Sequence, residues 1–151
     1  MKKINQTFLL FVIVLGFMSF QVGDIICDPK VLKEKAKNML DPYKYDSSEL
    51  TRIMYKKKES VKEVEVPLFI GEKYRFCFNM DAVPKTVEVQ IYNKDKESKN
   101  RKLLFSSKDQ GDKREFQFEI TKARHVFVDY VIPPVETGSY AGCAVFAIGY
   151  K

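Results

Sequence analysis

The sequence predicts an all-β protein: an antiparallel two-sheet sandwich, jelly-roll-like, with about eight strands and one short N-terminal helix. Three observations predict it. Short segments of alternating apolar and polar residues follow one another through the chain, as strands with one buried face require. Turn-forming residues separate these segments at short, even intervals. A helical pattern occurs only near the N-terminus, which favours a sandwich or barrel over an α/β fold.

The N-terminus has the composition of a secretory signal peptide. Lys2 and Lys3 precede an uncharged apolar run, Phe8–Phe20, of 13 residues. This length suits a signal peptide and is short of the ~20 residues that span a bilayer. We expect a signal peptide over residues 1–23, cleaved between positions 19 and 26, with a retained anchor as the alternative. The mature protein would then be periplasmic, extracellular or at the cell surface, and only the uncleaved signal peptide would contact a membrane.

The charge distribution indicates a solvated surface. The chain has 26 basic and 20 acidic residues, and loss of Lys2 and Lys3 leaves 24 basic ones, a net charge of about +4. Lysines and glutamates are interspersed, and the run Lys56-Lys57-Lys58 is typical of a solvated strand end. Nucleic-acid binders concentrate positive charge on one face and add stacking aromatics. Here the aromatics belong to the alternating apolar segments, so we expect no nucleic-acid partner.

The cysteines predict at most one disulfide. An oxidising compartment permits one bridge among Cys27, Cys77 and Cys143. A Cys27–Cys143 bridge would tie the expected helix to the last strand, while Cys27–Cys77 and three free thiols stay open as alternatives. The residues before Cys27, at 24–26, do not fit a lipobox, so we expect no lipidation. With no Cys-x-x-Cys and one histidine, we expect no metal.

Residues 24–48 are expected to form an N-terminal helix and a linker. Asp28 is placed to cap the helix, with Pro29 at its first position, where a missing N–H costs nothing. A loose apolar face recurs through KVLKEKAKNML, and Asp41-Pro42 should end the helix. The turn-rich segment Asp41–Ser48 predicts a link into the first strand. We expect the helix to pack on the sandwich as a lid.

The sandwich is expected to span residues 49–151. Val64–Asn79 alternates most clearly and predicts a hairpin of two strands joined at Gly71. Thr86–Tyr92 predicts another strand, and Gly142–Tyr150 is apolar on both faces, as in a strand inside a sheet beneath a cover. The side chains predicted to lie in the core are Tyr74, Phe76, Phe78, Val87, Val89, Ile91, Phe116, Phe118, Val128, Phe146 and Ile148.

The sequence presents no complete catalytic constellation. A serine or cysteine nucleophile needs a base held by a third group, and His125, the only histidine, lies at an expected strand start beside Arg124. No phosphate loop or dinucleotide fingerprint occurs. The acids considered for glycoside hydrolysis or calcium binding alternate with lysines or lie in turns: Glu63, Glu65, Glu115, Glu119, Asp109 and Asp112. We therefore expect no catalytic residue and no cofactor.

Two resemblances are carried by the order of segments. LFIGEKYRFCFN, then VEVQIYNKD, KLLFSS and GSYAGCAVFAIGYK, resemble a group of small secreted bacterial proteins of mostly unassigned function, typical of Bacteroidota, over residues 27–151. The Gly-x-x-Tyr-x-Phe beginning and the strand VEVQIY are similar to the bacterial pre-peptidase C-terminal domain, a jelly-roll-like sandwich appended to secreted enzymes. That family's tandem acidic residues after the central strand are missing. The resemblance implies a non-catalytic sandwich and transfers no functional residue.

The leading functional hypothesis is an exported, non-enzymatic binding or accessory module, whose partner is a protein or glycan of the cell envelope. The first alternative is a carbohydrate-binding module, which needs exposed aromatics on one face. Tyr43, Tyr45, Tyr92 and Tyr140 are the candidates near loops. The second alternative is a secreted enzyme with an unrecognised site, which would gather His125 with two acids in a pocket.

Overall fold

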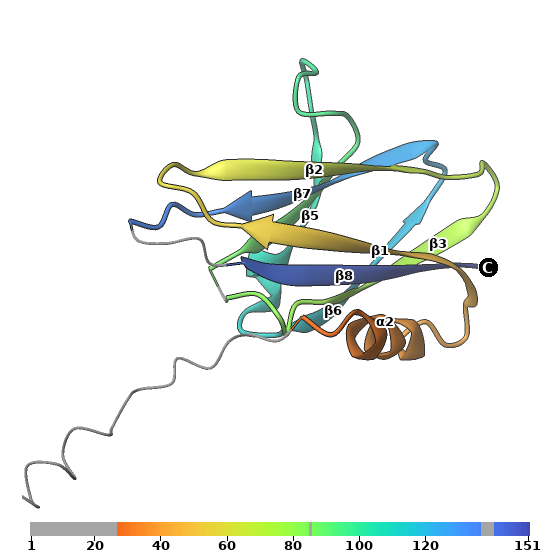
Figure 1. Cartoon of the computed structure of the whole chain (residues 1–151). Coiled ribbons are helices and arrows are strands. Elements are labelled where there is room, and N and C mark those ends of the chain that lie inside the picture. Colours follow the sequence, from red (N-terminus) through yellow and green to blue (C-terminus); the bar gives the residue numbers. More distant parts are fainter. Residues whose placement is uncertain (1–26, 85, 137–140) are drawn as a thin grey trace, which may run out of the picture.

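The computed structural model describes residues 27–84, 86–136 and 141–151. Strands dominate these residues, and one α-helix lies beside them (Figure 1). In chain order the elements are α2 (Pro29–Asn38), β1 (Lys44–Met54), β2 (Ser60–Pro67), β3 (Lys73–Asn79), β4 (Glu88–Tyr92), β5 (Leu103–Ser106), the 3₁₀ helix η1 (Ser107–Gln110), β6 (Glu115–Thr121), β7 (His125–Ile132) and β8 (Ala141–Tyr150).

The strands form two antiparallel four-stranded sheets. Sheet I has the order β1-β8-β3-β6 and sheet II the order β2-β7-β4-β5. The pairs are nested along the chain, with β1 beside β8, β2 beside β7, β3 beside β6 and β4 beside β5. This is the strand order of a jelly roll, in which an antiparallel ribbon is rolled into two sheets. The predicted two-sheet antiparallel sandwich is confirmed.

The hairpin predicted for Val64–Asn79 is wrong. β2 pairs with β7 in sheet II, whereas β3 pairs with β6 and β8 in sheet I. The loop between them, with Gly71 at a φ of 106°, carries the chain from one sheet to the other. Alternation correctly places Val66 and Phe76 in the core. The partner of a strand depends on contacts far apart in sequence, which local alternation does not encode.

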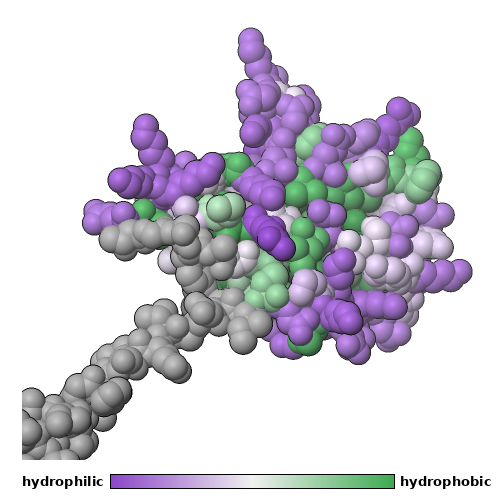
Figure 2. Space-filling model, in the orientation of Figure 1, coloured by the Kyte–Doolittle hydropathy of each residue, from purple (hydrophilic) through white to green (hydrophobic). Residues whose placement is uncertain are grey.

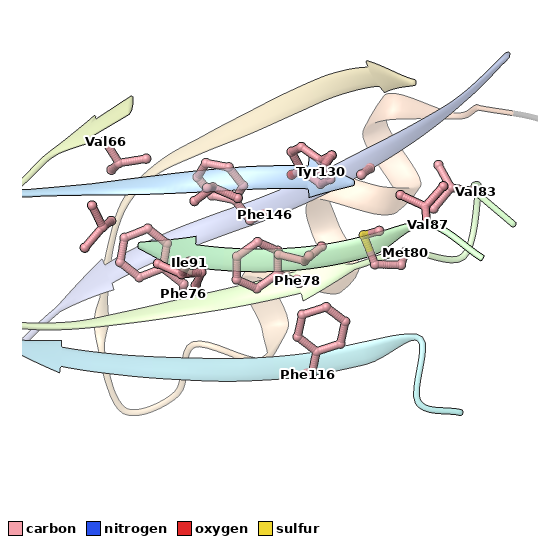
Figure 3. Packing of buried hydrophobic residues seen from close by; sticks show 14 of the residues in the cluster. Val66, Phe76, Phe78, Met80, Val83, Val87, Ile91, Phe116, Tyr130 and Phe146 are labelled. Carbon is pink, nitrogen blue, oxygen red and sulfur yellow. The ribbon is translucent and has the colours of Figure 1, made fainter. Parts of the chain in front are cut away.

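Aromatic rings from sheet I fill the space between the sheets. The ring centroids of Phe76, Phe78 and Phe146 lie 5.4 to 6.4 Å apart. Figure 3 shows these rings packed with Ile91 and Tyr130 of sheet II, and all five side chains are buried. Because such rings bury large apolar areas, this cluster contributes strongly to the driving force that holds the two sheets together.

Two predictions from the sequence are wrong at edge strands. Phe118 was predicted in the core, but it is half-buried because β6 is the last strand of sheet I. All other predicted core side chains are buried. The segment Asp41–Ser48 was predicted as a link, yet β1 begins at Lys44 and pairs with β8 from there. The first half of β1 is largely exposed, so it lacks the apolar alternation that marks a strand in the sequence.

The helix α2 covers the outer face of sheet I, as predicted. Asp28 caps it, since its carboxylate accepts hydrogen bonds from two backbone N–H groups of the first turn at 3.0 and 3.3 Å. Leu32, Ala36 and Leu40 are buried in a second apolar cluster, which includes Val145 of β8. Within the described residues, no helix combines the length and apolar character needed to cross a membrane.

Candidate functional site

A hollow of about 390 Å³ lies where the edge strands β1 and β2 meet, at the end of the sandwich with the β1–β2 connection (Figure 1). Its lining comes from both strands, from the β4–β5 loop and from the end of β7. Four of the lining side chains are cationic: Arg52, Lys56, Lys62 and Lys96. We call this feature the basic hollow. Hydrophilic side chains project around this end of the molecule in Figure 2.

The local sequence explains how β1 and β2 form the hollow. Along β1, Thr51 and Ile53 are buried while Arg52 and Met54 are exposed, as alternation requires. Both strands lie at the edge of their sheets, so no described strand covers them on this side. The Lys62 amine bridges the two edges, because its Nζ donates to the Arg52 carbonyl oxygen at 3.4 Å.

A partly buried ionic network fixes the β4–β5 loop against the hollow. The backbone N–H of Lys96 donates to Glu63 Oε2 at 2.7 Å. The Arg101 guanidinium donates to the same oxygen at 2.9 Å and to both Asp129 oxygens at 2.8 and 2.9 Å. Asp129 is 2% exposed, and Arg101 stacks 3.6 Å from the centroid of the Tyr92 ring. The network therefore holds Lys96 at the rim of the hollow.

The hollow carries uncompensated positive charge. None of its four cations forms an ion pair with a described residue. Its one acid, Glu63, is paired with Arg101 at 2.9 Å. Burial raises the pKa of the Glu63 carboxyl, while the Lys96 N–H and Arg101 act in the opposite direction. The four cations are thus available to an external anion.

The lining suits binding of a ligand with several negative charges. The four cations flank the exposed side chains of Met54 and Val61, which offer apolar contact. One exposed ion pair contributes only about 0–1 kcal/mol, so useful affinity requires several contacts at once. An extended acidic polymer meets this requirement better than a small molecule with one charge. The lining contains one hydroxyl, that of Ser60, and no histidine to activate it.

His125 is paired with one acid rather than two. Its Nδ1 lies 2.9 Å from Glu65 Oε1, and both side chains are at least half exposed on sheet II.

The two aspartates considered for calcium binding lie near η1: Asp109 lies in η1 and Asp112 in the turn after it. No group of three or more metal-ligating side chains occurs among the described residues. The structure therefore does not bring His125 and the acids of this turn into one site.

The remaining acids considered as catalytic candidates, Glu115 and Glu119, hold neighbouring strands of sheet I together. Glu119 lies 2.5 Å from Lys73 and 2.6 Å from Arg75, and these hydrogen-bonded cations, Lys73 first, lower the pKa of Glu119 to about 2. Glu115 accepts a hydrogen bond from Asn79 Nδ2 at 2.8 Å. Both contacts join β3 to β6, the edge strand of sheet I. These acids are committed to strand pairing.

The tyrosines considered for sugar binding do not form one platform in the described structure. Tyr43 is buried. Tyr45 is exposed on β1 of sheet I, whereas Tyr92 is half-buried on β4 of sheet II, beneath Arg101. Tyr140 lies outside the described residues. A flat sugar-stacking surface needs coplanar exposed rings on one face, and the three described tyrosines lie on different elements.

The structure joins Cys27 to Cys143, the pair favoured by the sequence. Their Cα atoms are 5.7 Å apart, within the range for a disulfide. The bridge ties Cys27, two residues before α2, to β8, the strand that α2 covers. Cys77 is the free cysteine and is buried between sheet I and α2. Burial raises the pKa of the Cys77 thiol to about 11, which makes it a poor nucleophile.

Sequence reasoning assigned none of the four cations in the hollow to a binding site. Lys56 belongs to a conspicuous lysine run, which was interpreted as a solvated strand end. Arg52, Lys62 and Lys96 are scattered through segments that also contain glutamates. Their common location depends on the sheet edges and on the loop held by Arg101. The only local signal is that the segments on either side of the lysine run also contain cations, Arg52 before it and Lys62 after it.

The sequence matches no protein-family model and no curated protein. The relationship to small secreted Bacteroidota-type proteins, and the more distant similarity to the pre-peptidase C-terminal domain, therefore stay predictions from the sequence.

Proposed function

We propose that this protein is an exported, non-enzymatic binding module that holds an acidic polymer of the cell envelope in the basic hollow. One observation carries the proposal: four cations without an ion-pair partner among the described residues line one hollow. Binding proteins place uncompensated charge where a ligand of opposite charge docks, because an unoccupied cluster of like charges costs stability. The polymer would be an acidic glycan or an acidic stretch of protein.

Export is supported by two independent features. The first is the signal-peptide composition of residues 1–23. The second is the Cys27–Cys143 bridge, since disulfides persist mainly in oxidising compartments. Together they favour the periplasm or the cell exterior as the location of the mature protein.

Binding to polyanions tests the proposal directly. Polygalacturonate serves as an acidic glycan, polyglutamate as an acidic peptide and dextran as a neutral control, with affinity measured by isothermal titration calorimetry at about 0.15 M salt. We expect the unmodified protein to bind at least one polyanion and not dextran. Lys56→Glu/Lys62→Glu should weaken binding at least ~10-fold, since each reversal removes one ion pair and adds one repulsion of about 0.5–1 kcal/mol.

The matched control is Lys30→Glu/Lys33→Glu on the exposed face of α2, which changes the net charge equally. This control should stay within about twofold of the unmodified protein, because it leaves the hollow intact. Equal losses in both variants would mean that net charge alone attracts the polymer, and would overturn the assignment of the site. Failure of the unmodified protein to bind either polyanion would overturn the proposed function.

A further inference from the structure

The β2–β3 connection exposes two adjacent large apolar side chains at the end of the sandwich opposite the basic hollow (Figure 1). Phe69 is 79% exposed and Ile70 62% exposed. A hydrophobic area is visible over this connection in Figure 2, at the upper right. Single exposed apolar residues are common, but neighbouring Phe and Ile at a loop tip form a patch with an energetic cost in water.

The backbone on both sides of the pair is fixed. The Leu68 N–H donates to the Arg124 carbonyl oxygen at 2.7 Å, and the Leu68 side chain is buried. The Phe69 N–H donates to Tyr74 Oη at 3.1 Å. Gly71 then reverses the chain at a φ of 106°, a conformation that favours glycine. The two apolar side chains are therefore presented to solvent by a well-anchored loop.

Basic residues lie on the strand ends and turns at this end of the sandwich. Four cations lie on strand ends or turns that adjoin it, and none forms an ion pair with a described residue: Lys44, Lys122, Arg124 and Lys151. The acids at this end are fewer than these cations, or they are already paired. Asp46 and Glu72 line a hollow beside Phe69, while Glu65 pairs with His125. Among the residues named here, the unpaired cations are more numerous than the two unpaired acids beside Phe69.

We propose that the Phe69–Ile70 loop docks this protein on an anionic membrane surface. The two apolar side chains would enter the headgroup region, and the surrounding cations would contact lipid phosphates. Shallow insertion of apolar groups combined with attraction of basic residues is the usual physical basis of reversible membrane binding, and each cation near such a surface contributes about 1 kcal/mol. A protein pocket for two apolar side chains would not by itself require unpaired cations nearby.

This site goes beyond the proposed function, because it lies at the other end of β2. Eight residues of strand separate the two ends, a distance of about 25 Å. A polymer in the basic hollow and a membrane at the loop can therefore be bound at the same time. The sequence predicted membrane contact only through the signal peptide, and the loop adds a second mode of contact.

A fluorophore on the loop tests the docking. In the Ile70→Cys variant, Cys77 is buried and the other two cysteines form the disulfide, so an environment-sensitive label attaches at position 70. Vesicles of phosphatidylcholine with about one third phosphatidylglycerol should shift the emission to the blue and raise its intensity at least ~2-fold. The readout is local, so apolar segments elsewhere in the chain do not affect it.

The matched control places the same label in Leu103→Cys, an exposed apolar position on β5 that lines neither the loop nor the basic hollow. We expect no change there, and Lys122→Glu/Arg124→Glu should reduce the response of the labelled loop at least ~5-fold. Three results would overturn the proposal: no response at position 70, equal responses at both positions, or an equal response to vesicles of phosphatidylcholine alone. An apolar protein surface as the true occupant would give the first of these. None of them depends on polyanion binding in the hollow.

Discussion

The double substitution Cys27→Ala/Cys143→Ala removes the covalent link between α2 and β8 while leaving their apolar contacts. The bridge joins residues 116 positions apart. In the unfolded chain a link of this span excludes many extended conformations, and the chain-entropy model assigns it about 5 kcal/mol. That model often exceeds measured values, so we expect the variant to lose about 3–5 kcal/mol of unfolding free energy. Domains of this size have about 5–15 kcal/mol in total, so the variant should be marginal.

Urea unfolding followed by far-ultraviolet circular dichroism measures this loss. The dependence of unfolding free energy on urea should also steepen, because the unlinked chain exposes more surface when it unfolds. Cys77→Ala is the matched control, since it removes a buried sulfur and keeps the bridge. It should cost about 1 kcal/mol with an unchanged slope. A loss below about 1 kcal/mol for the double variant, with no change in slope, would refute the reasoning about the bridge.

Three further predictions test the packing and the charges. Phe76→Ala should cost about 3–5 kcal/mol because its ring is fully buried, whereas Phe118→Ala on the edge strand should cost about half as much in the same urea assay. Lys73 helps hold the pKa of Glu119 at about 2, below its ordinary value of 4.5, so the stability it confers is complete above pH 4.5 and is lost as pH falls towards 2. Glu119→Gln should flatten that part of the stability–pH curve, and an unchanged curve would contradict the ion pairing. With its pKa near 11, Cys77 should resist iodoacetamide at pH 8 until the protein unfolds, and labelling of the native protein would contradict its burial.

Strand faces could be predicted from the sequence, and strand partners could not. Alternation placed Phe76, Phe78 and Val89 in the core because each segment has one apolar face whichever neighbour it pairs with. Val64–Asn79 was predicted as a hairpin because short loops often join paired strands. In a jelly roll nearly every consecutive strand changes sheet, and only β4 and β5 are neighbours both in sequence and in a sheet.

The helix cap illustrates what local chemistry can determine, and the bridge illustrates what an argument about packing can determine. Asp28 before Pro29 specifies a helix start through backbone hydrogen bonds within a few residues. The Cys27–Cys143 pairing followed from an argument about which strand needs a cover. The basic hollow had no comparable signal. Lys62 and Lys96 meet only because Arg101 holds a loop against β2, through a buried aspartate on a third strand.

Chemical-shift mapping by NMR tests the central claim most directly, because it locates the bound polymer residue by residue. Titration of isotopically labelled protein with short galacturonate oligomers should give saturable shifts in the amides of residues 52–62 and of Lys96. Residues of α2 and of the β2–β3 loop should remain unchanged. Shifts concentrated around Tyr45 or Tyr92, or no saturable shifts with either galacturonate or glutamate oligomers, would contradict the assignment of the basic hollow as the binding site.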